Sequence, residues 1–236
     1  MTRLQDELDL ALELADEADR ISLAHFRSER LLIETKPDMT PVSEADRQVE
    51  QAIRNHLSHA RPDHAVLGEE FGGVSSAAVR WVVDPIDGTK RYIRGVPLFA
   101  TLIALEEEGE LTLGVVSAPA LGRRWWAARG LGAFADGRPI RVSAVQHLVD
   151  AHVSLASLDN WIGQGLFDQV GRIAGTAWTS TGYGDFWSHM LVAEGDRRGS
   201  WRPVHRLLGR VNRRRWLGAH SSNAGPIHAE LLALLA

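Results

Sequence analysis

Apolar residues recur at helical spacing in the first sixty positions of the chain. From residue 4 to residue 26 they fall on one face of a helix, with acidic residues between them. A second stretch opens at Ser43, where the order Ser-Glu-Ala-Asp is typical of a capping box with Asp in the last place. The pattern therefore predicts two amphipathic helices. The expected apolar faces are Leu4, Leu8, Leu12, Ala15 and Ala18 in the first helix, and Val49, Ile53 and Leu57 in the second.

Short apolar segments bounded by turn residues follow the second helix, and this pattern predicts strands. Two of them are joined by a Glu-Glu-Glu-Gly-Glu turn, which is typical of a hairpin. After residue 149 the chain alternates between strand and helix patterns. The predicted strands are 65–67, 81–83, 98–105, 111–116, 124–128, 139–142, 153–155 and 177–179, and the later helices are 162–173 and 185–193.

The order of these elements predicts an α+β protein. Helices at the start, a sheet in the middle and alternating strands and helices afterwards favour layered packing. The 236 residues suit one domain, and no linker or internal repeat divides them. We therefore expect a single domain over residues 1–236. Within it, residues 197–215 are atypical because eight arginines fall there.

The composition excludes several classes of function. The chain has no cysteine, which excludes disulfides, zinc–cysteine sites and cysteine nucleophiles. Its net charge of −4 gives no overall attraction to nucleic acid, and its apolar runs are too short to span a membrane. The first residues lack the apolar core of a signal peptide. We expect a cytoplasmic protein that binds neither nucleic acid nor membrane.

The segment Asp84-Pro-Ile-Asp-Gly-Thr89 carries the candidate chemistry. Asp84 and Asp87 stand at the end of an apolar strand, where both carboxylates and the Ile86 carbonyl can point to one place. Glu69, at the end of the preceding predicted strand, offers a third carboxylate. Hard cations such as Mg²⁺ prefer oxygen ligands of this kind. Taken alone, an Asp-x-x-Asp-Gly sequence is also compatible with an ordinary turn.

Gly88 and Thr89 follow directly and open a predicted helix. Their N–H groups offer a place for an anion, and Gly88 allows close approach of the backbone. Carboxylates, a hard cation and an anion-binding turn together indicate metal-assisted hydrolysis of a phosphate ester. The expected partner is therefore a small phosphorylated metabolite.

Several segments together resemble one family, the inositol monophosphatases, which are Mg²⁺-dependent phosphatases. The resemblance covers residues 4–195 and 218–235. It is carried by Asp84–Thr89, Gly68–Glu70, Lys36–Asp46, Gly130–Phe134, Gly184–Phe186 and Leu191–Gly195. Four segments are similar in sequence to the actinobacterial histidinol-phosphatase branch of that family. They are Val66–Gly73, Arg94–Pro97, Ser117–Leu121 and Arg123–Gly130.

The resemblance implies the layered α-β-α-β-α sandwich of the sugar phosphatase superfamily and a homodimer. It also implies two or three Mg²⁺ ions in each site. The implied roles are metal binding for Glu69, Asp84, Ile86 (through its carbonyl) and Asp87, positioning of the attacking water for Glu69 and Thr89, and phosphate or substrate binding for Asp87, Gly88 and Thr89.

Two further acids have two interpretations each. Asp46 matches the family's acid near a third metal, but it also suits the first turn of a helix, where an acid stabilises the helix dipole. Asp185 matches a substrate-side position that faces the amino group or imidazole of histidinol, but it also suits the N-cap of its own helix. The sequence leaves both pairs of interpretations open.

The family pattern breaks after residue 195. The family carries a Trp-Asp pair whose Asp completes the second metal site, whereas Trp201 is here followed by Arg202. A deletion, a frameshift or a genuine variant would each explain the segment 197–215. The implied activity is hydrolysis of L-histidinol phosphate to L-histidinol in histidine biosynthesis. The alternatives are a phosphatase for inositol 1-phosphate or another small sugar phosphate, and a catalytically impaired remnant without the second-metal Asp.

Overall fold

The computed structural model describes residues 3–74, 77–155 and 158–195, and the chain divides after Pro139 into two compact units. The first unit holds the predicted pair of helices and the sheet, and the second holds the alternating strands and helices. The atypical segment 197–215 lies outside the described residues. The single domain expected over residues 1–236 stays a prediction.

Two long helices form where the sequence predicts them. Helix α1 spans Arg3–His25 and helix α2 spans Glu44–Ala60. The start of α2 is fixed by Ser43 and Asp46, because each side chain accepts a hydrogen bond from the backbone N–H of the other. This reciprocal pair is the predicted capping box. Between the helices, β1 (Ile33–Thr35) and β2 (Pro41–Ser43) pair antiparallel and form a short arm.

The strands of the first unit assemble into one sheet. Within the described residues it has seven strands in the order β3 to β9, of which β3 and β4 run parallel and the later pairs antiparallel. Because β3 and β4 run parallel, both strands end on the same side of the sheet. The elements are β3 (Ala65–Gly68), β4 (Val79–Asp87), α3 (Thr89–Tyr92), β5 (Ala100–Glu107), β6 (Glu110–Ala118), the 3₁₀ turn η1 (Pro119–Leu121), β7 (Arg123–Ala128), β8 (Gly132–Ala135) and β9 (Arg138–Pro139).

The strand predicted at residues 139–142 is wrong. β9 consists of only two residues, and residues 140–142 form no strand. The last hairpin instead turns at Gly137, where φ is 77°, and β8 occupies residues 132–135, for which no strand was predicted. Beyond this hairpin Val142 is 65% exposed, so this apolar residue does not belong to a buried strand.

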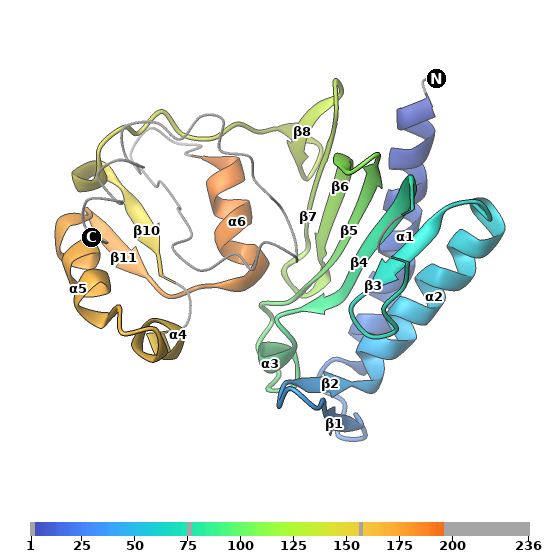
Figure 1. The fold of residues 1–236 in the computed structure, drawn as a ribbon, viewed down its shortest axis with the longest axis horizontal. Helices are drawn as coiled ribbons and strands as arrows, with labels where there is room; N and C mark the ends of the chain where they lie inside the picture. The colour runs from blue at the N-terminus through green and yellow to red at the C-terminus, as the bar shows by residue number, and fades with distance from the viewer. Residues whose placement is uncertain (1–2, 75–76, 156–157, 196–236) are drawn as a thin grey trace. The chain divides into compact units, whose positions relative to one another are not determined.

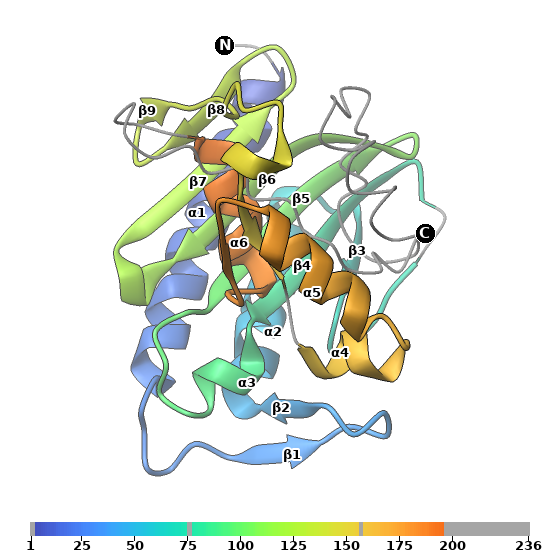
Figure 2. The ribbon, with the colours of Figure 1, turned by 90° about the vertical axis from the view of Figure 1, so that its left-hand side faces the viewer.

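The core of the first unit lies between the sheet and the two long helices, which cover one face of it (Figures 1 and 2). The predicted apolar face of α1 is partly wrong: Leu4 and Leu12 are only partly buried, whereas Leu14 is fully buried. Helix α1 packs against both α2 and the sheet, so its buried stripe is wider than a single face. The fully buried residues opposite it include Trp81 and Ile53.

The described part of the second unit contains a parallel strand pair with helices beside it. The helix predicted at residues 162–173 is wrong as a single element, because Gly165 adopts a φ of 69° and separates two helices. The strand predicted at 177–179 begins two residues later. None of the helices in the described ranges is long and apolar enough to cross a membrane. The elements are η2 (Leu148–Asp150), β10 (His152–Ser154), α4 (Leu158–Gly163), α5 (Phe167–Thr176), β11 (Thr179–Thr181) and α6 (Asp185–Glu194).

The packing of α1 on the sheet is testable by truncation. Leu14→Ala is expected to lower the free energy of unfolding by about 2–5 kcal/mol, because it leaves a cavity in a fully buried core. Leu23→Ala is the control on the same helix; Leu23 is 45% exposed, and a change within about 0.5 kcal/mol is expected. Urea unfolding followed by the fluorescence of the tryptophans measures both. Equal losses in the two variants would contradict this packing.

Candidate metal and phosphate site

The parallel pairing of β3 with β4 brings Glu69 and Asp84 to neighbouring strand ends. Gly68 lies opposite Val83 in the register, and the Glu69 N–H donates to the Val83 carbonyl at 3.2 Å. Glu69 and Asp84 are the next residues of their strands. The sequence suggested that these carboxylates meet, and the register places their backbones side by side.

Strand β4 continues through Asp87, so the prediction that the strand ends before Asp84 is wrong. Hydrogen bonds hold the irregular stretch from Asp84 to Asp87. The register of β4 against β5 is interrupted between Asp84 and Asp87, and the Pro85 carbonyl accepts from Thr101 Oγ1 at 2.8 Å. The Ile86 carbonyl accepts from Thr89 Oγ1 at 2.9 Å. Gly88 then enters the left-handed region with φ 89° and caps α3, so glycine is required there.

Asp84 is a strongly perturbed acid of the site. Burial raises its pKa well above the usual value, and the nearby carboxylates of Asp87, Glu69 and Asp46 raise it further. Its Oδ1 atom is buried and has no hydrogen-bond partner among the described residues. A carboxylate with a buried oxygen that lacks a hydrogen bond, close to other carboxylates, has the chemistry of a cation ligand. These residues therefore fit Mg²⁺, which takes oxygen ligands.

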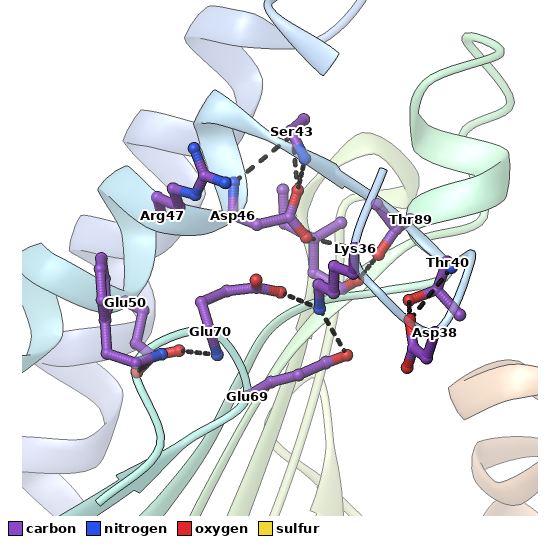
Figure 3. A network of polar contacts seen from close by, with 12 residues as sticks. Lys36, Asp38, Thr40, Ser43, Asp46, Arg47, Glu50, Glu69, Glu70 and Thr89 are labelled. Atoms are coloured by element: carbon purple, nitrogen blue, oxygen red, sulfur yellow. Dashed lines mark hydrogen bonds and ion pairs between the residues drawn. The ribbon is translucent and has the colours of Figure 1, made fainter. Parts of the chain in front are cut away.

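Lys36 brings a positive charge into the same cluster (Figure 3). It lies on the arm between β1 and β2, and its Nζ is 3.1 Å from Glu69 Oε1 and 2.6 Å from Glu70 Oε1. The sequence reasoning gave Lys36 no role. The available signal was its rarity, because Lys36 and Lys90 are the only lysines of the chain.

Asp46 links the start of α2 to the turn after β4. It is buried and accepts from the Ser43 N–H at 2.9 Å, which confirms its role at the helix start. Its Oδ1 is also 3.3 Å from Thr89 Oγ1. Burial is the main cause of its raised pKa, and the Glu69 carboxylate adds to it. Asp46 is therefore both a helix-capping acid and a member of the carboxylate cluster; its role at a third metal stays a prediction.

The first unit holds most of the predicted site. In residues 3–74, 77–155 and 158–195, no three His, Asp or Glu side chains are arranged so that they could hold a metal ion together. The number of ions and their ligands stay predictions. The predicted residues that lie in the first unit are Asp46, Glu69, Asp84, Ile86, Asp87, Gly88 and Thr89.

Asp185 lies in the second unit and opens helix α6 with a φ of 47°. The N-cap of α6 is Gly184, so the alternative of Asp185 as the N-cap is wrong. A positive φ is uncommon for a residue other than glycine, although Asp is among those that tolerate it. Its substrate-side role stays a prediction.

Comparison with known proteins places this geometry in one family. The chain matches the inositol monophosphatase family over residues 4–164. A histidinol-phosphatase of Mycobacterium tuberculosis is 54% identical over 196 residues, which cover 80% of this chain and 75% of that protein. One of Streptomyces coelicolor is 51% identical over 199 residues, with the same shares covered.

Solved structures superpose on this chain. The extragenic suppressor protein suhB from Bartonella henselae superposes with a TM-score of 0.74 at 30% identity, covering 80% of this chain and 75% of that one. An IMPase from Thermotoga maritima gives 0.72 at 30% identity, covering 80% and 73%. The predicted α+β fold class is thereby confirmed. With the family match over residues 4–164 and 54% identity to a relative, the chain belongs to the inositol monophosphatase family.

Proposed function

We propose that this chain is a Mg²⁺-dependent phosphomonoesterase that hydrolyses L-histidinol phosphate to L-histidinol and phosphate. The observation that carries the chemistry is the buried, unpartnered Oδ1 of Asp84 beside Glu69 and Asp87 in the described chain. The substrate is inferred from the names of relatives that are 51–54% identical. In the reaction a water oxygen bonds to phosphorus, the P–O bond to the alcohol breaks, and the alcohol oxygen gains a proton.

The carboxylate cluster would supply the metal ligands. Glu69, Asp84 and the carbonyl of Ile86 would hold a first Mg²⁺, and Asp84 with Asp87 a second. Asp46 is the candidate for a third. When bound, such ions neutralise the charge of the phosphate and favour ionisation of a water. Without a cation these side chains would repel a phosphate dianion.

Thr89 and Asp46 would handle the proton of the attacking water. The Thr89 hydroxyl lies 2.9 Å from the Ile86 carbonyl and 3.3 Å from Asp46 Oδ1, so it can donate to either and accept from a water. Burial raises the pKa of Asp46, which makes this carboxylate a better proton acceptor than a freely exposed aspartate. Glu69 would orient the same water from the neighbouring strand.

The phosphate and the alcohol would be bound by different parts of the chain. Gly88 and Thr89 stand at the start of α3, where N–H groups lack partners within the helix. They would bind phosphate together with Asp87. Asp185 would face the amino group or imidazole of histidinol.

One observation favours a second candidate, a catalytically impaired family member. Trp201 is followed by Arg202 where the family pattern has Asp, which leaves the second cation fewer anionic ligands. Inositol 1-phosphate is the alternative substrate. The homodimer and the cytoplasmic location stay predictions.

The first test is phosphate release by the purified chain. We expect Mg²⁺-dependent turnover, abolished by EDTA, with a higher kcat/KM for histidinol phosphate than for inositol 1-phosphate. The reverse preference would overturn the substrate. No turnover by folded protein, with activity gained when Arg202 is replaced by Asp, would favour the impaired member.

Removing the buried charge of Asp84 tests the metal site without an assay of activity. Asp84→Asn is expected to raise the Tm of the metal-free protein, because it removes a negative charge that lies among other carboxylates and has a buried oxygen without a hydrogen bond. In a chain of this size about 2–4 °C corresponds to 1 kcal/mol. Mg²⁺ should raise the Tm of the unaltered protein but not of the variant. Asp150→Asn, in the second unit, is the control; if Mg²⁺ stabilises the Asp84 variant equally, the site is elsewhere.

The role of the Thr89 hydroxyl can be tested separately from the role of the Thr89 backbone N–H. Thr89→Ala keeps the N–H but loses the hydroxyl, so we expect kcat to fall by about 10²–10⁴-fold with little change in KM. Thr89→Ser restores the hydroxyl and should recover most of kcat. Steady-state kinetics of the two variants decide the matter, and an Ala variant with normal kcat would remove Thr89 from the proton path.

A further inference from the structure

Glu50 is a buried carboxylate that the proposed chemistry does not use. It belongs to helix α2, and its side chain is 0% exposed. A buried ionised carboxylate is costly unless it is paired and hydrogen-bonded. The groups that bind Glu50 therefore indicate what its charge does in the fold.

Two of these groups are backbone N–H donors of the turn after β3. The Glu70 N–H donates to Glu50 Oε2 at 2.7 Å (Figure 3), and the Phe71 N–H donates to Oε1 at 3.2 Å. Arg54 Nε, one helical turn further along α2, donates to Oε1 at 2.8 Å. The carboxylate thus binds the two residues that directly follow Glu69.

Arg54 also binds backbone carbonyls on both sides of the same turn. Its guanidinium donates from Nη1 to the Val66 carbonyl at 3.4 Å, and from Nη2 to the Gly72 carbonyl. The Gly72 carbonyl also accepts from the Gly68 N–H at 2.9 Å, which closes the turn. The pair of Glu50 and Arg54 therefore fixes both sides of the turn.

Gly68 shows how closely this carboxylate and the turn fit. A Cβ at Gly68 would lie 1.8 Å from Glu50 Oε1, so any other residue there would displace the Glu50 carboxylate. The backbone conformation at Gly68 does not itself require glycine. Glycine is needed there because Glu50 occupies the space of a side chain.

The geometry points to Glu50 as a positioning residue for Glu69. By binding the N–H groups of Glu70 and Phe71, it fixes the backbone from which the Glu69 carboxylate projects. This inference rests on the proposed function. Within that function, Glu50 sets the position at which Glu69 meets Mg²⁺ and the attacking water. A buried ion pair with a structural role alone would affect folding stability and leave metal affinity unchanged.

Two variants test the charge of the Glu50 side chain separately from its length. Glu50→Gln keeps the size of the side chain but loses the charge and one acceptor oxygen, and Glu50→Asp keeps the charge but is one methylene shorter. The matched control is Glu7→Gln, because Glu7 is also a buried carboxylate paired with an arginine, Arg61, at 2.9 Å. All are made in the full chain. The readouts are Mg²⁺ binding by calorimetry, amide hydrogen exchange of Glu70 and Phe71 by NMR, and steady-state kinetics.

We expect both Glu50 variants to bind Mg²⁺ about 10–100-fold more weakly, the range seen when a residue supporting a metal ligand is changed. kcat should fall by a similar factor while KM for histidinol phosphate stays nearly constant. The amides of Glu70 and Phe71 should be protected in the unaltered chain and exchange faster in both variants. Glu7→Gln should retain the Mg²⁺ affinity of the unaltered chain.

Three results would overturn the role of Glu50. They are normal Mg²⁺ affinity in folded Glu50 variants, equal weakening in Glu7→Gln, and unprotected amides at Glu70 and Phe71 in the unaltered chain. The last needs no variant, so it decides even if the variants do not fold. If the unaltered chain binds Mg²⁺ but does not release phosphate, the proposed function fails, and the binding and exchange measurements still test Glu50.

Discussion

Gathering carboxylates at one edge of a sheet costs free energy, because like charges repel and burial removes their hydration. Asp84 carries part of this cost, since burial, then Asp87 and Glu69, raise its pKa. The strand ends cannot separate, because β3 and β4 are paired in register and packed on a buried core. The cost therefore stays local and electrostatic, and a cation is what relieves it. The ammonium of Lys36 supplies part of that positive charge between Glu69 and Glu70.

Helix α2 organises this edge through its polar residues as much as through its apolar face. Asp46 caps the helix and reaches Thr89, in the turn after β4. Glu50, four residues on and therefore on the same face, binds the turn after β3 at Glu70. One helix thus connects the two turns that carry the site. The burial of its apolar residues against the sheet fixes the distance between those turns, which ties the packing energy of the core to the chemistry at its edge.

The sequence predicts those parts of the molecule that local patterns determine. The capping box at Ser43 and the helix start at Gly88 and Thr89 depend on residues within a few positions of each other, and both form as predicted. The sequence gives no indication of those features that distant contacts decide. The burial of Glu50 depends on the turn after β3 lying against it, and a single charge on an acid-rich helix gives no sign of this. The contact of Lys36 with Glu69 likewise joins residues 33 positions apart.

The residues that would hold metal and phosphate cannot by themselves select a substrate, because every phosphomonoester presents the same dianion to them. Selection depends on groups that contact the alcohol. Histidinol carries an ammonium and an imidazole, whereas inositol carries only hydroxyls, so an acid such as Asp185 would distinguish them by charge. Substrate preference and metal chemistry are therefore separable properties of the chain. Under the proposed ligand set, the change at Arg202 would belong to the second of these, because it would alter the anionic ligands available to a cation and leave Glu69, Asp84 and the Ile86 carbonyl in place. Such a chain would lose catalytic power while its first metal site and its fold persist.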